Sequence, residues 1–143
     1  AHGPDPGPLS AEGRRPVRGG KAVTIDQAVA RCDSVKPNQY SREDKVRWLS
    51  EADGQIRREI LDPWEGQEDF DGYDEDTPGT TPLLAPETYC GLYEAYLSAR
   101  IDFCNGEFTR YQNSAQLYNA LFGDLADWYR RTHLPLQENA ITL

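Results

Sequence analysis

The stretch that decides the fold is "PETYCGLYEAYLSARIDFCNGEFTRYQNSAQLYNALFGDLADWYRRTH", which runs from Pro86 to His133. Its apolar residues recur every three or four positions, the spacing of one helix face. They form two stripes, Tyr89, Leu92, Tyr93, Tyr96, Leu97, Ile101 and Cys104, then Phe108, Tyr111, Ala115, Tyr118, Phe122, Leu125 and Tyr129. Between them, Asn105-Gly106 is a natural left-handed helix end. We therefore predict helices over 86–104 and 107–133 that form an αα-hairpin; because the stripes stay in phase, one long helix is the alternative.

Two further helices are predicted upstream. "TIDQ" is a capping box in which Thr24 and Gln27 satisfy each other's backbone, so a helix over 24–35 begins there. Ser41 is the N-cap of a second helix, over 41–61, which stops ahead of Asp62-Pro63. With the hairpin, these elements predict a mainly α fold, a small bundle of about four helices.

Residues 62–85 have no helical period and form an acidic loop or a short β-hairpin insertion. In the second case "EDFDGY" and "TPLLA" pair as strands around the turn-rich "DEDTPGT". A structureless loop of this length is unusual in a compact domain, which favours some β structure.

The two ends of the chain read differently from the rest. Residues 1–23 are predicted to be a disordered leader because they are rich in Pro and Gly and have no apolar period. The alternative is a basic interaction arm, since Arg14, Arg15, Arg18 and Lys21 cluster there. Residues 134–143 follow the last helix as a tail, which could add a strand to a partner.

Composition narrows the function classes. The 143 residues suffice for one domain with a core. The formal net charge of −9 disfavours nucleic-acid and anionic membrane surfaces as partners. No apolar run approaches the roughly 20 residues that span a bilayer. The three cysteines are widely spaced, which fits reduced thiols in a cytoplasm.

The acidic stretch can be interpreted in three ways. A calcium site needs a closed set of oxygens, but the glycine comes too early for an EF-hand. Paired catalytic carboxylates need a pocket that separates their pKa values. We favour the third, a solvated acidic surface, with Asp69, Asp71, Asp74, Glu75 and Asp76 as its candidate residues and with no metal or cofactor.

Catalytic motifs are otherwise absent from the sequence. His133 is interpreted as a cation in the last turn of a helix. Cys90 and Cys104 lie on or beside the apolar stripe, so core packing is expected. Aromatic residues outside the stripes either pack the loop onto the helices or anchor a protein interface; with the tail, the candidate interface residues are Trp64, Phe70, Tyr73 and Leu143.

Three stretches carry a family resemblance. They are "TIDQAVARCDSVKPNQYSREDKVRWLSEADGQIRREI", "YDEDT…LLAPETYCGLYEAYLSARIDFCNGEFTRYQNS" and "DWYRRTH". Over residues 24–143 the chain resembles the head-to-tail connector, or adaptor, proteins of tailed bacteriophages. The order of short helix, "KPNQYS", long helix, acidic loop, "LLAP" and tyrosine-rich helices carries the likeness.

The resemblance implies a structural subunit without catalytic residues. About a dozen copies would form a ring that docks on the phage portal, meets tail-side connector proteins and extends the DNA channel. Such a protein assembles in the cytoplasm of the host bacterium and ends in the virion. DNA would pass without specific binding, and we hypothesise that Asp69 to Asp76 face the lumen. The alternatives are a prophage or bacterial protein-interaction module and, less favoured, a metal-dependent enzyme that uses the acidic loop.

Overall fold

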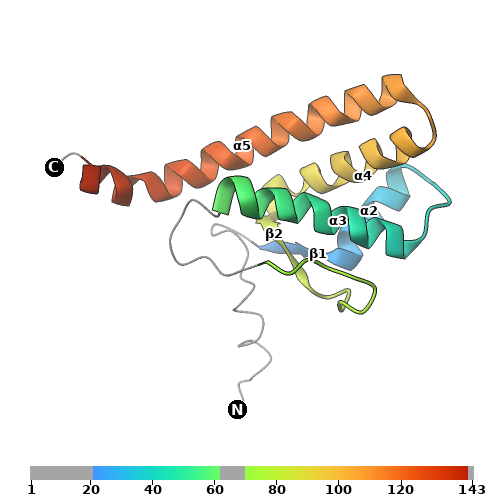
Figure 1. Cartoon of the computed structure of the whole chain (residues 1–143), viewed down its shortest axis with the longest axis horizontal. Coiled ribbons are helices and arrows are strands. Elements are labelled where there is room, and N and C mark those ends of the chain that lie inside the picture. Colours follow the sequence, from blue (N-terminus) through green and yellow to red (C-terminus); the bar gives the residue numbers. More distant parts are fainter. Residues whose placement is uncertain (1–20, 62–69, 142–143) are drawn as a thin grey trace, which may run out of the picture.

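The computed structural model describes residues 21–61 and 70–141, with side chains described as far as Thr132. It is mainly helical and carries a small antiparallel sheet, as the sequence predicts (Figure 1). The elements run β1 (Ala22–Thr24), α2 (Ile25–Val35), α3 (Arg42–Ile56), β2 (Pro82–Pro86), α4 (Gly91–Cys104) and α5 (Phe108–Ile141). A π-helical turn, Arg57–Leu61, extends α3, and a 3-10 turn, Glu87–Tyr89, precedes α4.

The N-termini of α2 and α3 form as their sequences predict. Thr24 accepts the Gln27 amide hydrogen at 3.2 Å while the Gln27 side chain accepts the Thr24 amide hydrogen at 3.1 Å. Ser41 caps α3 by accepting the Asp44 amide hydrogen at 3.0 Å. These bonds satisfy N–H groups that the first turn of a helix leaves without partners.

The αα-hairpin prediction is correct. Gly106 takes the left-handed φ of 74°. The Glu107 amide then donates to the Asp102 carbonyl at 2.9 Å, and the Gly106 amide to the Phe103 carbonyl at 3.0 Å. This pair of bonds is the Schellman arrangement, which closes the C-terminus of a helix. It turns the chain back, so that α5 runs antiparallel to α4 (Figure 1).

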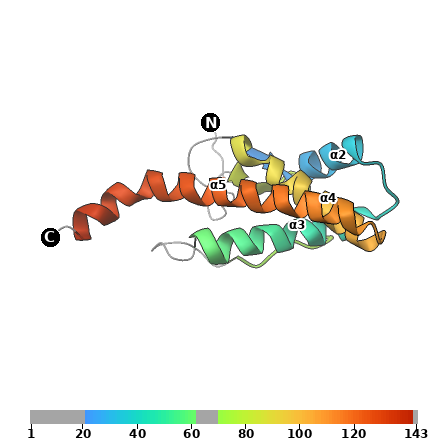
Figure 2. The same cartoon turned by 90° about the horizontal axis from the view of Figure 1, so that it is seen from above.

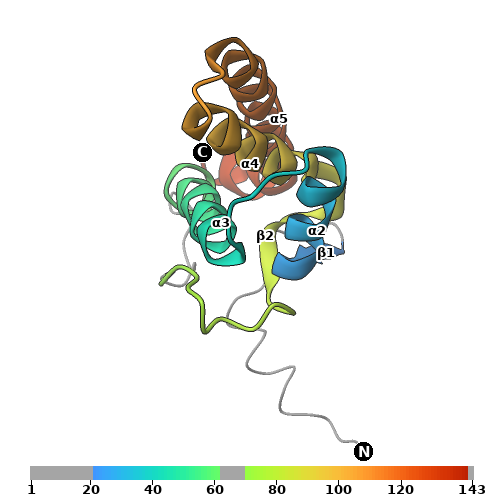
Figure 3. The same cartoon turned by 90° about the vertical axis from the view of Figure 1, so that its right-hand side faces the viewer.

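The core surrounds α4. Leu92, Tyr93, Leu97 and Ile101 of this helix are fully buried. Viewed end-on, α4 lies beneath α5, with α3 and α2 on either side and the sheet below (Figure 3). Seen from above, α5 crosses the body and its C-terminal part extends past the other elements (Figure 2).

The expected strand pairing and the expected end of the leader were both wrong in detail. β2 pairs with β1, Ala22 opposite Pro86 and Thr24 opposite Pro82, and not with "EDFDGY", since residues 70–81 contain no strand. The predicted leader therefore ends earlier than residue 23, because Ala22 and Val23 are held by this pairing. Val23 is buried beneath the pair. Residues 1–20 lie outside the described part of the chain.

The predicted end of the last helix at His133 was also wrong. α5 continues through Pro135 to Ile141, so most of the expected tail is helical. An interior proline removes one backbone hydrogen bond and its ring crowds the carbonyl four residues back, which can kink a helix without ending it. The flanking leucines, Gln137 and Ala140 are good helix formers. Figure 1 shows the last turns bending away from the line of the earlier ones. His133 therefore lies inside the helix and not in its last turn.

Candidate protein-interaction site

A buried carboxylate fixes the acidic loop to the helical body. Asp53 of α3 is fully buried. Its Oδ2 accepts the Tyr73 hydroxyl at 2.6 Å and the Leu84 amide at 3.1 Å, and its Oδ1 accepts the Tyr93 hydroxyl at 2.5 Å. One side chain thus joins the loop, β2 and α4, because a buried carboxylate must have its oxygens paired.

Tyr93 shows how strongly this network depends on its protons. Burial, and then the negative charge of Asp53, raise the pKa of the Tyr93 hydroxyl well above its usual range. The hydroxyl also accepts the Ala85 amide hydrogen at 2.9 Å. Tyr93 therefore stays a neutral donor to Asp53, and it holds β2 against α4.

The described part of the acidic loop, residues 70–81, is held at both ends. Gly72 has a φ of 88°, and a Cβ there would lie 2.8 Å from the Ser50 hydroxyl of α3. At the other end, the Ile25 and Asp26 amides of α2 donate to the Thr81 and Gly79 carbonyls, both at 3.0 Å. The loop therefore has a defined position below α3 (Figure 3).

The predicted acidic residues of this loop are exposed where the structure describes them. Asp71, Asp74, Glu75 and Asp76 all lie at the surface, and Asp69 lies outside the described residues. Asp74 orders the tip, since its Oδ1 accepts the Asp76 amide hydrogen at 2.9 Å. Glu75 and Asp76 therefore project from a built turn.

Like charges crowd this turn. The Glu43 carboxyl of α3, through a shared hydrogen bond and then through its charge, raises the pKa of the Glu75 carboxyl, and Asp76 adds to the effect. The shared hydrogen bond and, after it, the neighbouring negative charges both favour the protonated form of Glu75. The loop tip is thus a surface that a cation would stabilise.

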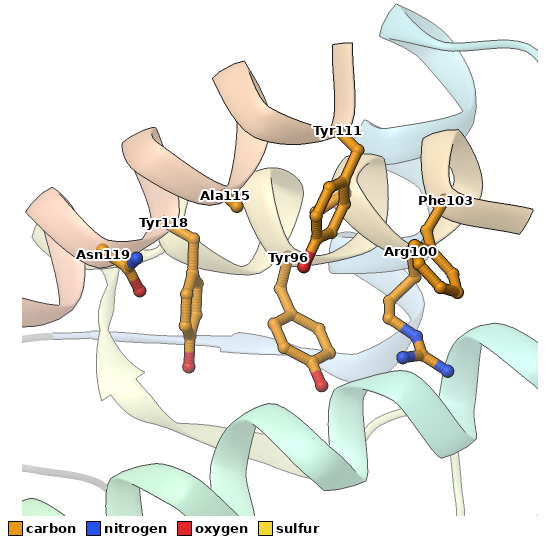
Figure 4. Close-up of a pocket in the computed structure, with 8 residues that line it drawn as sticks. Tyr96, Arg100, Phe103, Tyr111, Ala115, Tyr118 and Asn119 are labelled. Atoms are coloured by element: carbon orange, nitrogen blue, oxygen red, sulfur yellow. The ribbon is translucent and has the colours of Figure 1, made fainter. Parts of the chain in front are cut away.

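A second surface feature is a pocket between α4 and α5 (Figure 4). The cavity measures about 270 Å³. Its lining combines aromatic, cationic and amide side chains: Tyr96, Arg100, Phe103, Tyr111, Tyr118 and Asn119, with Ala99 and Ala115 between them. Figure 4 shows that Tyr96, Tyr118 and Arg100 extend toward α3.

Contacts with α3 fix two of these tyrosines. The Tyr96 hydroxyl donates to Glu51 Oε1 at 2.8 Å, and the Tyr118 hydroxyl donates to Gln55 Oε1 at 2.7 Å. The two rings lie 5.0 Å apart between centroids. Burial, and then the hydrogen bond to Glu51, raise the pKa of Tyr96, while burial, and then Tyr96, raise that of Tyr118. The pocket wall is therefore preorganised and neutral.

Arg100 supplies the charge of the pocket. Its guanidinium lies 5.6 Å from the Trp48 ring centroid, within cation–π range. The nearest approach to Glu51 is 3.9 Å, from Nε to Oε1, which is too long for a hydrogen bond. Arg100 Nε is buried and has no hydrogen-bond partner among the described residues.

Aromatic side chains continue from the pocket to the end of the hairpin. Phe103 lines the pocket and is 50% exposed, and Phe108 is 57% exposed. The Phe103 ring lies 5.9 Å from Phe108 and 5.4 Å from Tyr111. Exposed aromatic rings beside an arginine have the composition of protein interfaces.

The predicted interface residues are placed differently from one another. Tyr73 is only 7% exposed, which fits the alternative in which these aromatic residues pack the loop onto the helices. Its ring centroid lies 5.1 Å from that of Phe70. Phe70 itself is half-buried. Trp64 and Leu143 lie outside the described residues. Phe70 and Tyr73 thus pack the loop onto the helical body.

Sequence reasoning missed the residues that matter most here. Neither Asp53 nor Arg100 is among the candidate residues that the sequence predicts. The available signal was position: Arg100 follows Tyr96 by one helical turn, on the same stripe.

The cysteine thiols and possible metal ligands are the remaining groups with reactive side chains. Cys32 and Cys90 are buried, and Cys90 Sγ accepts a hydrogen bond from Arg31 Nη1 at 2.8 Å. Cys104 is exposed, contrary to the packing expected for it. Among the described residues, no His, Cys, Asp and Glu side chains gather in a group of three that could hold a metal ion. Nor does any helix in 21–61 or 70–141 combine the length and apolar character needed to cross a bilayer.

Comparison of the chain with protein-family models, curated proteins and solved structures found no match. Function is therefore argued from the chain's own residues.

Proposed function

We propose that this chain is a structural subunit of a phage head-to-tail connector ring, which docks on the portal and extends the DNA channel. The observation that carries the proposal is the placement of two unlike surfaces on opposite sides of α3. The pocket side meets α3 at Trp48, Glu51 and Gln55. The loop side meets it at Ser50 and Asp53.

Two unlike surfaces are what a ring subunit needs. A heterologous contact joins one patch of a copy to a different patch of the next, and it closes into a ring when the rotation permits. A self-complementary dimer would need only one patch. The long helix α5, which extends past the body, adds a surface for a further component such as the portal (Figure 2).

The sequence resemblance supplies the biological setting. The chain follows the connector order of short helix, long helix, acidic loop and tyrosine-rich hairpin, and the fold is mainly α. In that setting the protein assembles in the bacterial cytoplasm, becomes part of the virion, and acts without catalysis.

The test is to co-express the chain with the portal protein encoded in the same genome and to examine the product by electron microscopy. We expect class averages with a ring coaxial with the portal. A chain that stays monomeric or dimeric beside free portal, or a genome with no portal gene near this one, would contradict the proposal and favour an interaction module.

A further inference from the structure

The α4–α5 pocket holds a cation, Arg100, whose ion pair with Glu51 is long and lacks a hydrogen bond. Glu51, the nearest carboxylate, accepts its hydrogen bond from Tyr96 and stays 3.9 Å from Arg100. Arg100 Nε is buried and has no hydrogen-bond partner among residues 21–61 and 70–132. An unpaired donor in a partly dry site is costly, and a carboxylate satisfies a guanidinium best, with two parallel bonds.

The pocket is accessible to another protein. The Arg100 side chain is 37% exposed. Three tyrosines and one arginine belong to the lining, and these residue types are enriched among the residues that carry most of the binding energy at protein interfaces. The exposed rings of Phe103 and Phe108 extend the surface beyond the cavity, which favours a protein over a small molecule as the occupant.

The acidic loop of the chain offers the complementary charge. Glu75 and Asp76 project from an ordered turn, and Glu43 crowds them with a like charge. The end-on view shows α3 between the loop and the α4–α5 hairpin (Figure 3). The pocket is lined by residues of that hairpin, so α3 separates it from the loop within one molecule. The two surfaces can therefore meet only between copies.

We infer that the pocket of one copy receives the loop tip, Glu75 and Asp76, of a second copy, with Arg100 pairing with their carboxylates. This contact rests on the proposed function, because it is the heterologous joint between neighbouring ring subunits. It places the loop tip at the seam between subunits and not free in the lumen, where the sequence led us to expect it.

Charge reversal on either side tests the joint. Arg100→Glu puts a carboxylate opposite the incoming loop, and Glu75→Arg with Asp76→Arg puts cations opposite Arg100. Each variant, mixed with the portal, should need at least tenfold more protein for half-maximal ring formation, measured by mass photometry, because opposed like charges cost more than 1.4 kcal/mol. Thermal melts establish that each variant is folded.

Rescue makes the test specific. A chain with all three reversals restores opposite charges across the seam, so ring formation should return to within about threefold of the original midpoint. The matched control is Arg110→Glu, which makes the same charge change at an exposed arginine of α5 outside the pocket lining. It should leave the midpoint unchanged.

Three outcomes would overturn the joint. If the chain with Glu75→Arg and Asp76→Arg formed normal rings, the loop tip would not lie at the seam, and the hypothesis that it faces the lumen would be favoured. Normal rings from Arg100→Glu that no longer bind the portal would make the pocket a portal site. Two defective variants without rescue in the combined chain would show that the two surfaces do not meet. The proposed function survives all three, because it is tested by whether the unaltered chain forms a ring on the portal.

Discussion

At the scale of single residues, Asp53 determines where the acidic loop lies. The helix that carries it, α3, would be amphipathic without it, yet the carboxylate is fully buried and accepts hydrogen bonds from three separate segments. The carboxylate contributes to stability mainly by accepting these hydrogen bonds, because removing it leaves several buried donors unpaired.

We predict that Asp53→Ala lowers the free energy of unfolding by about 3 kcal/mol or more, since the hydroxyls of Tyr73 and Tyr93 and the Leu84 amide lose their acceptor. Urea unfolding followed by circular dichroism measures the change. Asp71→Ala removes an exposed carboxylate of the same loop and is the matched control, with a much smaller loss. A loss below about 1 kcal/mol for Asp53→Ala would contradict the anchoring role.

Buried acids with raised pKa values predict alkaline sensitivity. Burial, and then the charge of Asp33, raise the pKa of Cys32 from 9.0 to about 11, and the pKa values of Tyr93, Tyr96 and Tyr118 are also raised. The unfolded chain releases these protons first, so stability is complete below the unfolded pKa values and falls as pH rises.

The fall should begin near pH 9, with Cys32, and steepen above about pH 10, each group adding up to about 1.4 kcal/mol per pH unit. Urea unfolding at a series of pH values measures the slope. Tyr118→Phe removes one titrating group and should flatten it. An unfolding free energy that stays constant up to about pH 11 would show that these groups titrate equally in both states.

At the scale of elements, the α4–α5 turn decides the hairpin. Gly106 has a left-handed φ of 74°, while a Cβ added there meets nothing within 4 Å. Gly123 of α5 also has open space around it, but its φ is ordinary for a helix. Substituting these two glycines therefore measures the effect of backbone conformation on stability without a steric clash of the added Cβ.

We expect Gly106→Ala to destabilise the protein by about 1 kcal/mol, because an L residue is strained in the left-handed region. Gly123→Ala should stabilise it by up to about 1 kcal/mol, because alanine favours a helix interior. Differential scanning calorimetry on the two variants checks the opposite signs. Equal shifts in the same direction would be incompatible with the Schellman turn.

The four helices of the described residues could be predicted because the local sequence of each contains capping or periodicity signals. Capping residues mark α2 and α3, and Asn105-Gly106 separates two apolar stripes. The partner of β2 could not be predicted in this way, since a three-residue strand far away in sequence carries no local period. The extension of α5 past Pro135 was not predicted because the missing hydrogen bond and the ring–carbonyl clash of a proline can either end a helix or only kink it, and the local sequence does not distinguish the two.

The candidate site was predicted only in part. Exposed acidic residues in the loop follow from composition, and the structure places Asp71, Asp74, Glu75 and Asp76 at the surface. The burial of Tyr73 and the missing hydrogen bond of Arg100 Nε depend on which residues of α3 face which neighbour. Contacts between elements depend on how several segments pack together, so they cannot be predicted from the sequence of one segment.

At the scale of the whole molecule, net charge and surface placement bear on the proposed assembly. With a net charge of −9, copies of the chain repel one another unless a local cation meets an acidic surface. The pocket and the loop tip provide that complement on opposite sides of α3. Salt should therefore weaken the contact between copies, since part of the joint is an exposed ion pair.

Native mass spectrometry of the chain bound to the portal encoded in its genome is the most direct test of the ring assignment. We predict one dominant species in which about a dozen copies of the chain sit on each portal assembly, with no partial rings at saturation. A portal that binds no copies, or only one or two at saturating concentration, would contradict the assignment.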